Sequence, residues 1–279
     1  MIIFKKAEDL QQYIDSEKKR KAIIGFVPTM GALHDGHISL LQHCTTDNDV
    51  SVCSIFINPT QFNNPEDFKK YPVTIEKDLE QLLANGCTAL FLPSVEEVYP
   101  KGHQKKQYNL GELETLLEGR YRPGHFQGVC EVVDRLLSLV QPDRLYLGQK
   151  DYQQCMVIKK MIEDEYNGNI ELKTVPTVRE KSGLAMSSRN MRLNGEQQQQ
   201  AAQLYQTLLF TKNNILEKDP TTLEQIATKR LSEQGFMVDY VAIANSQTLQ
   251  PVLQKEEPKV ALLAASINNV RLIDNLILS

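Results

Sequence analysis

Short apolar runs alternate with segments of helical periodicity over the first 180 residues. The apolar runs are rich in β-branched residues and predict five strands: 22–28, 50–57, 88–92, 144–148 and 170–178. Between them, apolar residues recur every three or four positions, which predicts helices at 37–46, 75–85, 126–140 and 152–166. Because the strands are apolar on both faces, we expect a parallel sheet covered by helices on both sides, a doubly wound α/β layer.

The pattern changes near residue 180, inside the segment VREKSGLAMSSRN. A glutamine-rich segment from about residue 194 opens a helix, and its four glutamines are interpreted as an exposed helix face. A second helix is expected at 221–235, followed by three short strands near 237–243, 259–266 and 270–277, with a turn at Asn268 and Asn269. These elements predict a smaller C-terminal α+β unit, and we place the domain boundary between residues 179 and 180.

Composition narrows the possible function classes. The formal net charge of −4 argues against a nucleic-acid-binding protein, which usually carries a basic surplus. The five cysteines are scattered and odd in number, as expected of buried thiols in a reducing compartment. The longest apolar run, VALLAA, is far too short to span a bilayer, and the first residues lack the order of a secretory signal. We therefore expect a cytoplasmic protein without a membrane partner.

A pair of histidines follows the first predicted strand, in the segment LHDGHISL (33–40). In an open α/β sheet, ligands bind beyond the carboxyl ends of the strands, and the N–H groups that begin a helix attract anions there. Gly31 and Gly36 allow a ligand close to the backbone, and imidazole N–H groups can bind phosphate oxygens as charge builds up in a transition state. Taken alone, such a pair of histidines, His34 and His37, would more often be structural.

Two further segments offer groups that bind phosphate. GLAMSSRN (183–190) combines a glycine, two hydroxyls and Arg189 on an expected loop, although an ordinary helix cap would look the same. LGQKDYQQ (147–154) ends a strand and begins a helix, which places Lys150 at the sheet edge, where a lone lysine is usually solvated. Three such segments from separate parts of the chain favour a nucleotide site.

Five segments together resemble the pantoate–β-alanine ligase (pantothenate synthetase) family of the nucleotidyltransferase superfamily, which has a HIGH-type motif: PTMGALHDGH, SIFINPTQF, RPGHFQGV, GQKDYQQ and GLAMSSRN. The resemblance runs from end to end and includes the closing RLIDN. It implies a Rossmann-like domain, 1–179, that binds ATP and pantoate, and a C-terminal α+β lid domain, 180–279. The implied reaction is the ATP-dependent condensation of (R)-pantoate with β-alanine to pantothenate, through pantoyl adenylate, with release of AMP and pyrophosphate. ATP as co-substrate, Mg²⁺ and a homodimer follow from the same resemblance.

The resemblance also implies roles for individual residues. His34, His37, Lys150 and Arg189 would be catalytic, with His37 as a proton donor. Gln61 and Gln154 would bind pantoate, with Gln61 also at the β-alanine position. The implied ATP site comprises Met30, Gly31, Ala32, Leu33, His34, Asp35, Gly36, His37, Gly148, Gln149, Lys150, Asp151, Val178, Met186, Ser187, Ser188 and Arg189.

Several residues admit two interpretations. Phe62 and the valines at 129, 132 and 133 would either enclose the methyl groups of pantoate or belong to the core. Asp151 would either contact ribose or cap a helix. Asp78 is interpreted as an exposed helix acid that is either solvated or close to magnesium, and the metal ligands stay open.

The chain departs from the family pattern at three positions, Gln149, Glu131 and Arg135, which stand where relatives usually have glutamate, threonine and lysine. Two alternatives to the ligase remain at this point: another adenylyl-transferring enzyme of the same superfamily, and a nucleotide-binding protein without enzymatic activity.

Overall fold

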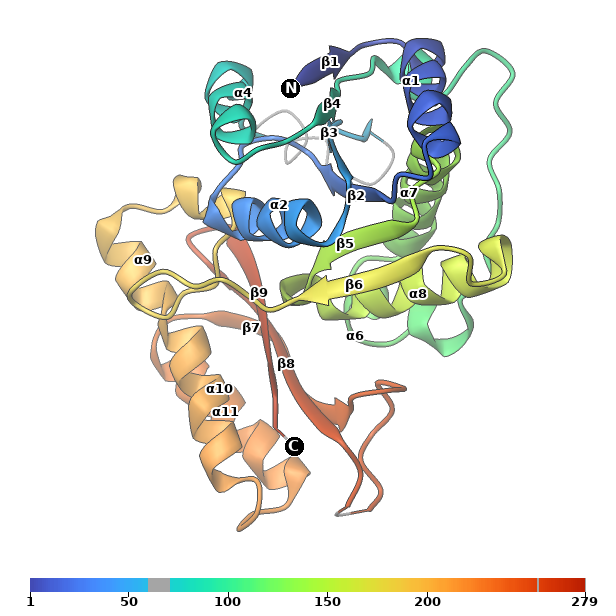
Figure 1. Cartoon of the computed structure of the whole chain (residues 1–279). Coiled ribbons are helices and arrows are strands. Elements are labelled where there is room, and N and C mark those ends of the chain that lie inside the picture. Colours follow the sequence, from blue (N-terminus) through green and yellow to red (C-terminus); the bar gives the residue numbers. More distant parts are fainter. Residues whose placement is uncertain (60–70, 255, 279) are drawn as a thin grey trace. The chain divides into compact units, whose positions relative to one another are not determined.

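The computed structural model describes residues 1–59, 71–254 and 256–278, and Figure 1 shows its helices and strands. Contacts within the chain divide it into two compact units. The first contains Met1–Gly148 and Gln154–Pro176, and the second contains Gln149–Gln153 and Thr177–Ser279. The division between Pro176 and Thr177 lies close to the boundary expected from the sequence. The segment Gln149–Gln153 also belongs to the second unit, through contacts that the sequence does not reveal. The nucleotide-binding and lid roles of the two parts stay predictions.

The first unit is built on a parallel sheet of six described strands in the order β1–β4–β3–β2–β5–β6. The strands are β1 (Ile2–Phe4), β2 (Ile24–Thr29), β3 (Val50–Ile55), β4 (Ala89–Phe91), β5 (Arg144–Gly148) and β6 (Glu171–Val175). The chain runs from β2 outward to β3 and β4, then returns to the other side of β2 for β5 and β6. The sheet therefore changes direction between β2 and β5, and the doubly wound α/β prediction is confirmed.

Helices cover both faces of this sheet (Figure 1). The longer ones are α1 (Ala7–Lys19), α2 (Asp35–Asp47), α4 (Ile75–Ala84), α7 (His125–Val140) and α8 (Tyr152–Tyr166). Shorter pieces are α5 (Val95–Val98), η2 (Gly111–Glu114), α6 (Leu117–Tyr121) and η3 (Gln149–Asp151). One core cluster joins α1, α7 and α8 to the sheet through residues such as Leu10 and Leu137, and another joins α2 and α4 through Leu41 and Leu82. Burial on both faces explains the continuously apolar strands.

The edge strand β1 is absent from the strands predicted by the apolar pattern. Among the described residues it pairs with β4 alone, and its Ile2 and Ile3 side chains are 48% and 45% exposed. A four-residue apolar run (MIIF) followed by lysines gives too weak a signal for a strand, and pairing with β4 supplies the missing stabilisation. All five cysteines are buried as reduced thiols. Among the described residues, no helix combines the length and apolarity needed to cross a membrane.

The second unit packs helices against an antiparallel sheet in the order β7–β8–β9. Its elements are η4 (Ser188–Arg192), α9 (Gly195–Ala201), α10 (Gln203–Asn214), α11 (Pro220–Glu233), β7 (Met237–Asn245), β8 (Lys259–Ile267) and β9 (Val270–Ile277). Asn268 and Asn269 take positive φ angles in the β8–β9 turn, as that turn type requires. The smaller α+β domain is confirmed, but the exposed glutamine face is wrong. Gln198 is half-buried and its amide donates to the backbone of Asn190.

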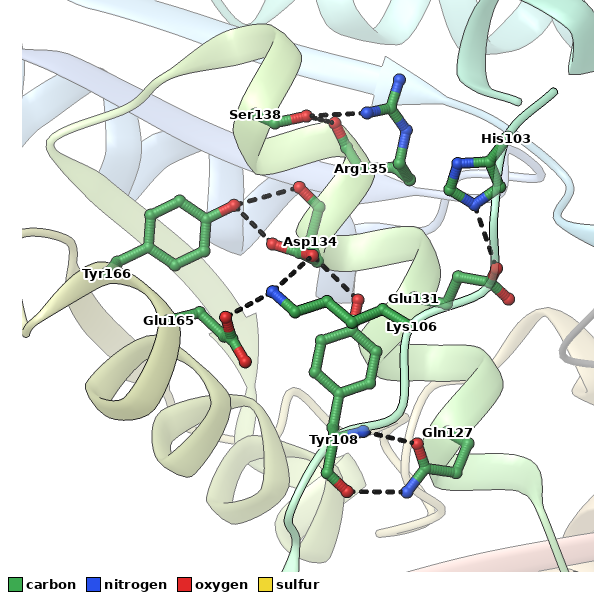
Figure 2. Close-up of polar contacts among 10 residues, drawn as sticks. All are labelled: His103, Lys106, Tyr108, Gln127, Glu131, Asp134, Arg135, Ser138, Glu165 and Tyr166. Atoms are coloured by element: carbon green, nitrogen blue, oxygen red, sulfur yellow. Dashed lines mark hydrogen bonds and ion pairs between the residues drawn. The ribbon is translucent and has the colours of Figure 1, made fainter. Parts of the chain in front are cut away.

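Asp134 of α7 holds together three segments of the first unit (Figure 2). The hydroxyls of Tyr108 and Tyr166 donate to its carboxylate at 2.8 and 2.7 Å, and the Lys106 ammonium lies 3.7 Å away. The pKa of each tyrosine is raised above the usual value of 10.0. Burial is the largest cause, and the hydrogen bond to Asp134 is the second. The network fixes α7 against α8 and against the connection that follows β4.

Two residues that depart from the family pattern, Glu131 and Arg135, contact the segment that follows β4. Oε1 of Glu131 lies 3.1 Å from His103 Nε2 (Figure 2). Arg135 Nε donates to the carbonyl of Val98 at 2.9 Å. Both side chains project from α7 toward the segment after β4. Their physical role is therefore to fasten this segment to the helix.

Alkaline pH should weaken the fold through the two tyrosines. Above pH ~10 the unfolded chain releases phenolic protons that folded Tyr108 and Tyr166 retain, so the free energy of unfolding falls as pH rises. The slope is at most about 1.4 kcal/mol per pH unit for each tyrosine. Denaturant unfolding between about pH 9 and about pH 11 should show a shallower slope for the double variant Tyr108→Phe, Tyr166→Phe. Equal slopes in the wild-type protein and the double variant would contradict the assignment.

Candidate active site

The carboxyl ends of β2 and β5 lead into two of the segments predicted to bind phosphate. These strands are neighbours in the sheet, with Phe26 paired to Leu145, and the sheet changes direction between them. Ligands bind at such a crevice in open α/β sheets. After β2, residues 30–34 lead directly into α2. After β5, Gly148 is followed by η3.

His34 and His37 cap the amino end of α2 with their own rings. His34 is the N-cap residue, and its Nδ1 accepts the backbone N–H of Gly36 at 3.2 Å. His37 reaches back, so that its Nδ1 accepts the backbone N–H of His34 at 3.3 Å. The ring centroids lie 4.0 Å apart. The two imidazoles therefore form a reciprocal capping box of the kind usually made by Ser or Thr with Glu or Gln.

A buried carboxylate holds the loop before this cap. Asp78 of α4 is 0% exposed and accepts the backbone N–H groups of Ala32 and Leu33 at 2.9 and 2.8 Å. Its third partner is the hydroxyl of Thr74, which donates at 3.0 Å. The interpretation of Asp78 as an exposed helix acid is therefore wrong: the loop covers it. Sequence reasoning missed this role because the contact spans 45 or 46 residues.

The backbone of this loop needs such an anchor. Gly31 and Ala32 have φ angles of +81° and +50°, and the second is costly for a residue with a Cβ atom. A Cβ at Gly31 would lie 3.1 Å from Asp78 Oδ2, so a glycine fits the close approach. Asp78 takes the N–H groups of Ala32 and Leu33, and the rings of His37 and His34 take those of His34 and Gly36, so the backbone of this turn is held by side chains. Contact of residues 30–37 with ATP stays a prediction.

The second unit fixes the segment that carries Lys150. Asn275 of β9 is 2% exposed, and its amide Nδ2 donates to the carbonyls of Gln149 and Lys150, each at 2.9 Å. The Gln149 side chain donates in turn to Asn275 Oδ1 at 3.3 Å. A glutamate could not donate this bond, which gives Gln149 a structural role. The ammonium of Lys150 lies 3.2 Å from Asp151, whose side chain is 43% exposed.

An ion pair next to Asn275 organises the segment that carries Arg189. Arg179 binds Asp274 through two nitrogens at 2.6 and 2.9 Å, and its guanidinium lies 3.8 Å from the ring centre of Tyr205. Burial raises the pKa of Asp274, and Arg179 opposes that shift. Because desolvation offsets much of the attraction, the pair contributes geometry more than stability. Arg179 also donates to the carbonyl of Gly183 at 3.1 Å.

The segment 178–190 folds back on itself in a short turn. The N–H of Met186 donates to the carbonyl of Val178 at 3.0 Å, and Arg179 forms an antiparallel bridge with Ala185. Ser187 then caps η4, with its hydroxyl accepting the N–H of Arg189 at 3.3 Å. The structure thus brings the predicted residues of this segment together within the second unit. The other predicted group, residues 30–37, belongs to the first unit.

The predicted pantoate residues are described only in part. Gln61 and Phe62 lie outside the described residues. Gln154 is half-buried near the start of α8. The three valines are 3–6% exposed and belong to the core cluster of α7, which favours the core interpretation.

The described residues contain no group of three or more His, Cys, Asp or Glu side chains that could hold a metal ion. The carboxylate of Asp78 is engaged by three hydrogen bonds, and Gln149 is neutral. These residues do not fit a resident magnesium site. Magnesium commonly binds through substrate phosphates with few protein ligands, so an ion would arrive with a nucleotide.

Comparisons with known proteins agree over the whole chain. A family model described as pantoate-beta-alanine ligase matches residues 2–277. Pantothenate synthetases from Cytophaga hutchinsonii and Thermotoga petrophila are both 43% identical, over 283 and 281 residues that cover 100% of this chain and 99% and 100% of the relatives. A crystal structure of pantothenate synthetase from Thermus thermophilus has a TM-score of 0.92 at 39% identity and covers 100% of this chain and 99% of that one. One of pantoate-beta-alanine ligase from Francisella tularensis, complexed with beta-gamma ATP and beta-alanine, has a TM-score of 0.84 at 38% identity, with 99% and 97% covered.

Removing one acceptor from Asp78 should disturb the loop before the histidines. Asp78→Asn keeps the size of the side chain but turns an NH₂ group toward a buried backbone N–H. We expect a loss of about 1–3 kcal/mol in the free energy of unfolding and roughly tenfold weaker ATP binding. Urea unfolding and calorimetric titration measure the two effects. Glu80→Gln, an exposed change on the same helix, should alter neither quantity. Wild-type ATP affinity in folded Asp78→Asn would show that the anchor does not serve the nucleotide site.

Proposed function

The chain belongs to the pantoate–β-alanine ligase family, and on that premise we propose that it condenses (R)-pantoate with β-alanine in two steps, of which the first consumes ATP. The observation that carries this proposal is the match of the family model to residues 2–277. An adenylyl-transferring enzyme of another kind, or a protein without activity, finds no support in relatives that are 43% identical from end to end.

In the first step, a carboxylate oxygen of pantoate attacks the α-phosphorus of ATP. The bond from that phosphorus to the oxygen bridging the β-phosphorus breaks, and pyrophosphate leaves with the electron pair. Negative charge on the phosphate oxygens must be stabilised as the pentavalent arrangement forms. In the second step the amine of β-alanine attacks the acyl carbon, AMP leaves, and one proton is released.

The residue roles in this reaction are part of the proposal. His34 and His37 would donate hydrogen bonds to phosphate oxygens at the amino end of α2, which itself favours anions. Lys150 and Arg189 would neutralise charge on the departing pyrophosphate, and Ser187 and Ser188 would orient it. The reciprocal cap of the histidines and the fixed main chain at Lys150 support these assignments, because both hold donor groups in place before substrate binds.

The remaining features rest on the family resemblance alone. We propose that magnesium enters bound to ATP, that Gln61 and Gln154 recognise pantoate through their amides, and that residues 180–279 act as a lid which keeps water from the adenylate. A homodimer and a cytoplasmic location belong to the same set of proposals.

Isotope exchange tests the reaction directly. With pantoate, ATP and magnesium but without β-alanine, the protein should exchange labelled pyrophosphate into ATP, because the carboxylate is activated before the amine enters. An acyl-phosphate mechanism would release ADP, and a nucleotidylyltransferase would require a phosphorylated substrate. Either of those results, or the absence of exchange, would refute the proposal.

A double-mutant cycle tests whether Asn275 acts through Lys150. Each of Asn275→Ala and Lys150→Ala should slow pyrophosphate exchange, Lys150→Ala by about tenfold or more, while reaction of supplied pantoyl adenylate with β-alanine changes little. The effects should not add, because Asn275 acts on the lysine by fixing the main chain that carries it. Asn245→Ala, which removes a partly buried contact to Glu257 in the same unit, is the control and should leave the exchange rate unchanged. Fully additive effects would mean that Asn275 serves the fold in general.

A further inference from the structure

We infer that His34 and His37 work as a pair of neutral imidazoles, each with its proton held on Nε2 by the cap that they make for α2. Their action on phosphate rests on the proposed function. The position of the protons does not, because it follows from the hydrogen bonds of the ring nitrogens.

The acceptors in the cap determine the tautomer. A backbone N–H can only donate, so a ring nitrogen that binds one must offer a lone pair. His34 Nδ1 accepts from Gly36, and His37 Nδ1 accepts from His34. Neither Nδ1 can carry a proton in this arrangement. In a neutral imidazole the proton is then on Nε2, the nitrogen on the far side of the ring from the helix cap.

The same helix contains a histidine of the opposite kind. His43 places Nδ1 2.8 Å from the carbonyl oxygen of Ser39, and a carbonyl can only accept. Its Nδ1 must therefore carry a proton. The start of α2 is therefore expected to hold one tautomer and His43 the opposite one. The difference arises because Nδ1 of His34 and His37 contacts a backbone N–H, whereas Nδ1 of His43 contacts a backbone carbonyl.

Protonating either ring of the pair would break the cap. A proton on Nδ1 would remove the acceptor from a backbone N–H in the first turn of α2. The new positive charge would lie at the positive end of the helix dipole, and the neighbouring ring centre is only 4.0 Å away. The structure therefore favours hydrogen-bond donors of fixed direction over a mobile proton.

The proposed chemistry needs no proton at this point. A pantoate carboxylate is already ionised, and pyrophosphate can leave as an anion, so the first step forms and breaks bonds at phosphorus without proton transfer. What it requires is donors aimed at oxygens that gain charge. Two fixed Nε2–H groups meet that need, and this assignment replaces the proton-donor role that the family resemblance implies for His37.

Nitrogen NMR of the wild-type protein tests the tautomers. With ¹⁵N-labelled histidine at about pH 8, above the unperturbed imidazole value of about 6.5, long-range proton–nitrogen spectra distinguish protonated from unprotonated ring nitrogens. Single substitutions of each histidine assign the signals. His34 and His37 should show unprotonated Nδ1 and protonated Nε2, and His43 should show the reverse. A protonated Nδ1 in either member of the pair would overturn the inference, whether or not the protein is active.

A matched pair of variants tests what the outer nitrogen does. His34→Asn keeps an acceptor that can cap α2 but has no group at the Nε2 position, whereas His34→Ala loses both. His34→Asn should keep the wild-type melting temperature while His34→Ala melts lower, and both should lose about two orders of magnitude in pantoate-dependent pyrophosphate exchange. Wild-type exchange in His34→Asn would overturn the role given to Nε2. Absence of exchange in the wild-type protein would instead refute the proposed function and leave the tautomer result intact.

Discussion

The carboxylate of Asp78 is the constraint on which the amino half of the candidate site depends. The chain leaves β2 through two residues in the left-handed region, an arrangement that a free loop would not keep. Two backbone N–H groups donate to this single buried carboxylate, which compensates for that strain and fixes the direction in which the chain enters α2. His34 becomes the N-cap residue because the loop delivers it there. The position of the ring therefore depends on an acid from another helix.

The second unit fixes its own segments with an amide and an ion pair. An asparagine amide from β9 binds two consecutive carbonyls of the segment after β5, and the neighbouring Asp274 binds Arg179 at the start of the segment that carries Arg189. The closing motif RLIDN thus supplies supports for two other motifs. An amide suits this place because it can donate to carbonyls and accept from Gln149 at once.

The sequence was sufficient for most of the fold because its signals are local. Buried parallel strands produce continuous apolar runs, and helices covering them repeat every three or four residues, so β2 to β6 and the long helices between them are predicted within a few residues. The edge strand β1 lacks such a signal, since in the part of the chain that the structure describes it is paired with β4 alone. Local sequence signals likewise reveal only part of the candidate site. The histidine segment is visible from its neighbours, whereas Asp78 and Asn275 act across 45 or more residues, and nothing in their own surroundings marks them.

The reciprocal cap explains why imidazoles occupy positions that other side chains fill more often. Serine, threonine and aspartate are common N-cap residues, and glutamate or glutamine commonly completes the box three residues later. Each of those side chains would satisfy the helix amides, but none carries a donor on its opposite side at a fixed angle. An imidazole is rigid and has two nitrogens, so binding the helix through one of them aims the other. The hydrogen bonds that stabilise the start of α2 therefore also determine which ring nitrogen carries the proton and the direction in which its N–H bond points. The fold thus establishes the geometry of the two rings before any substrate arrives.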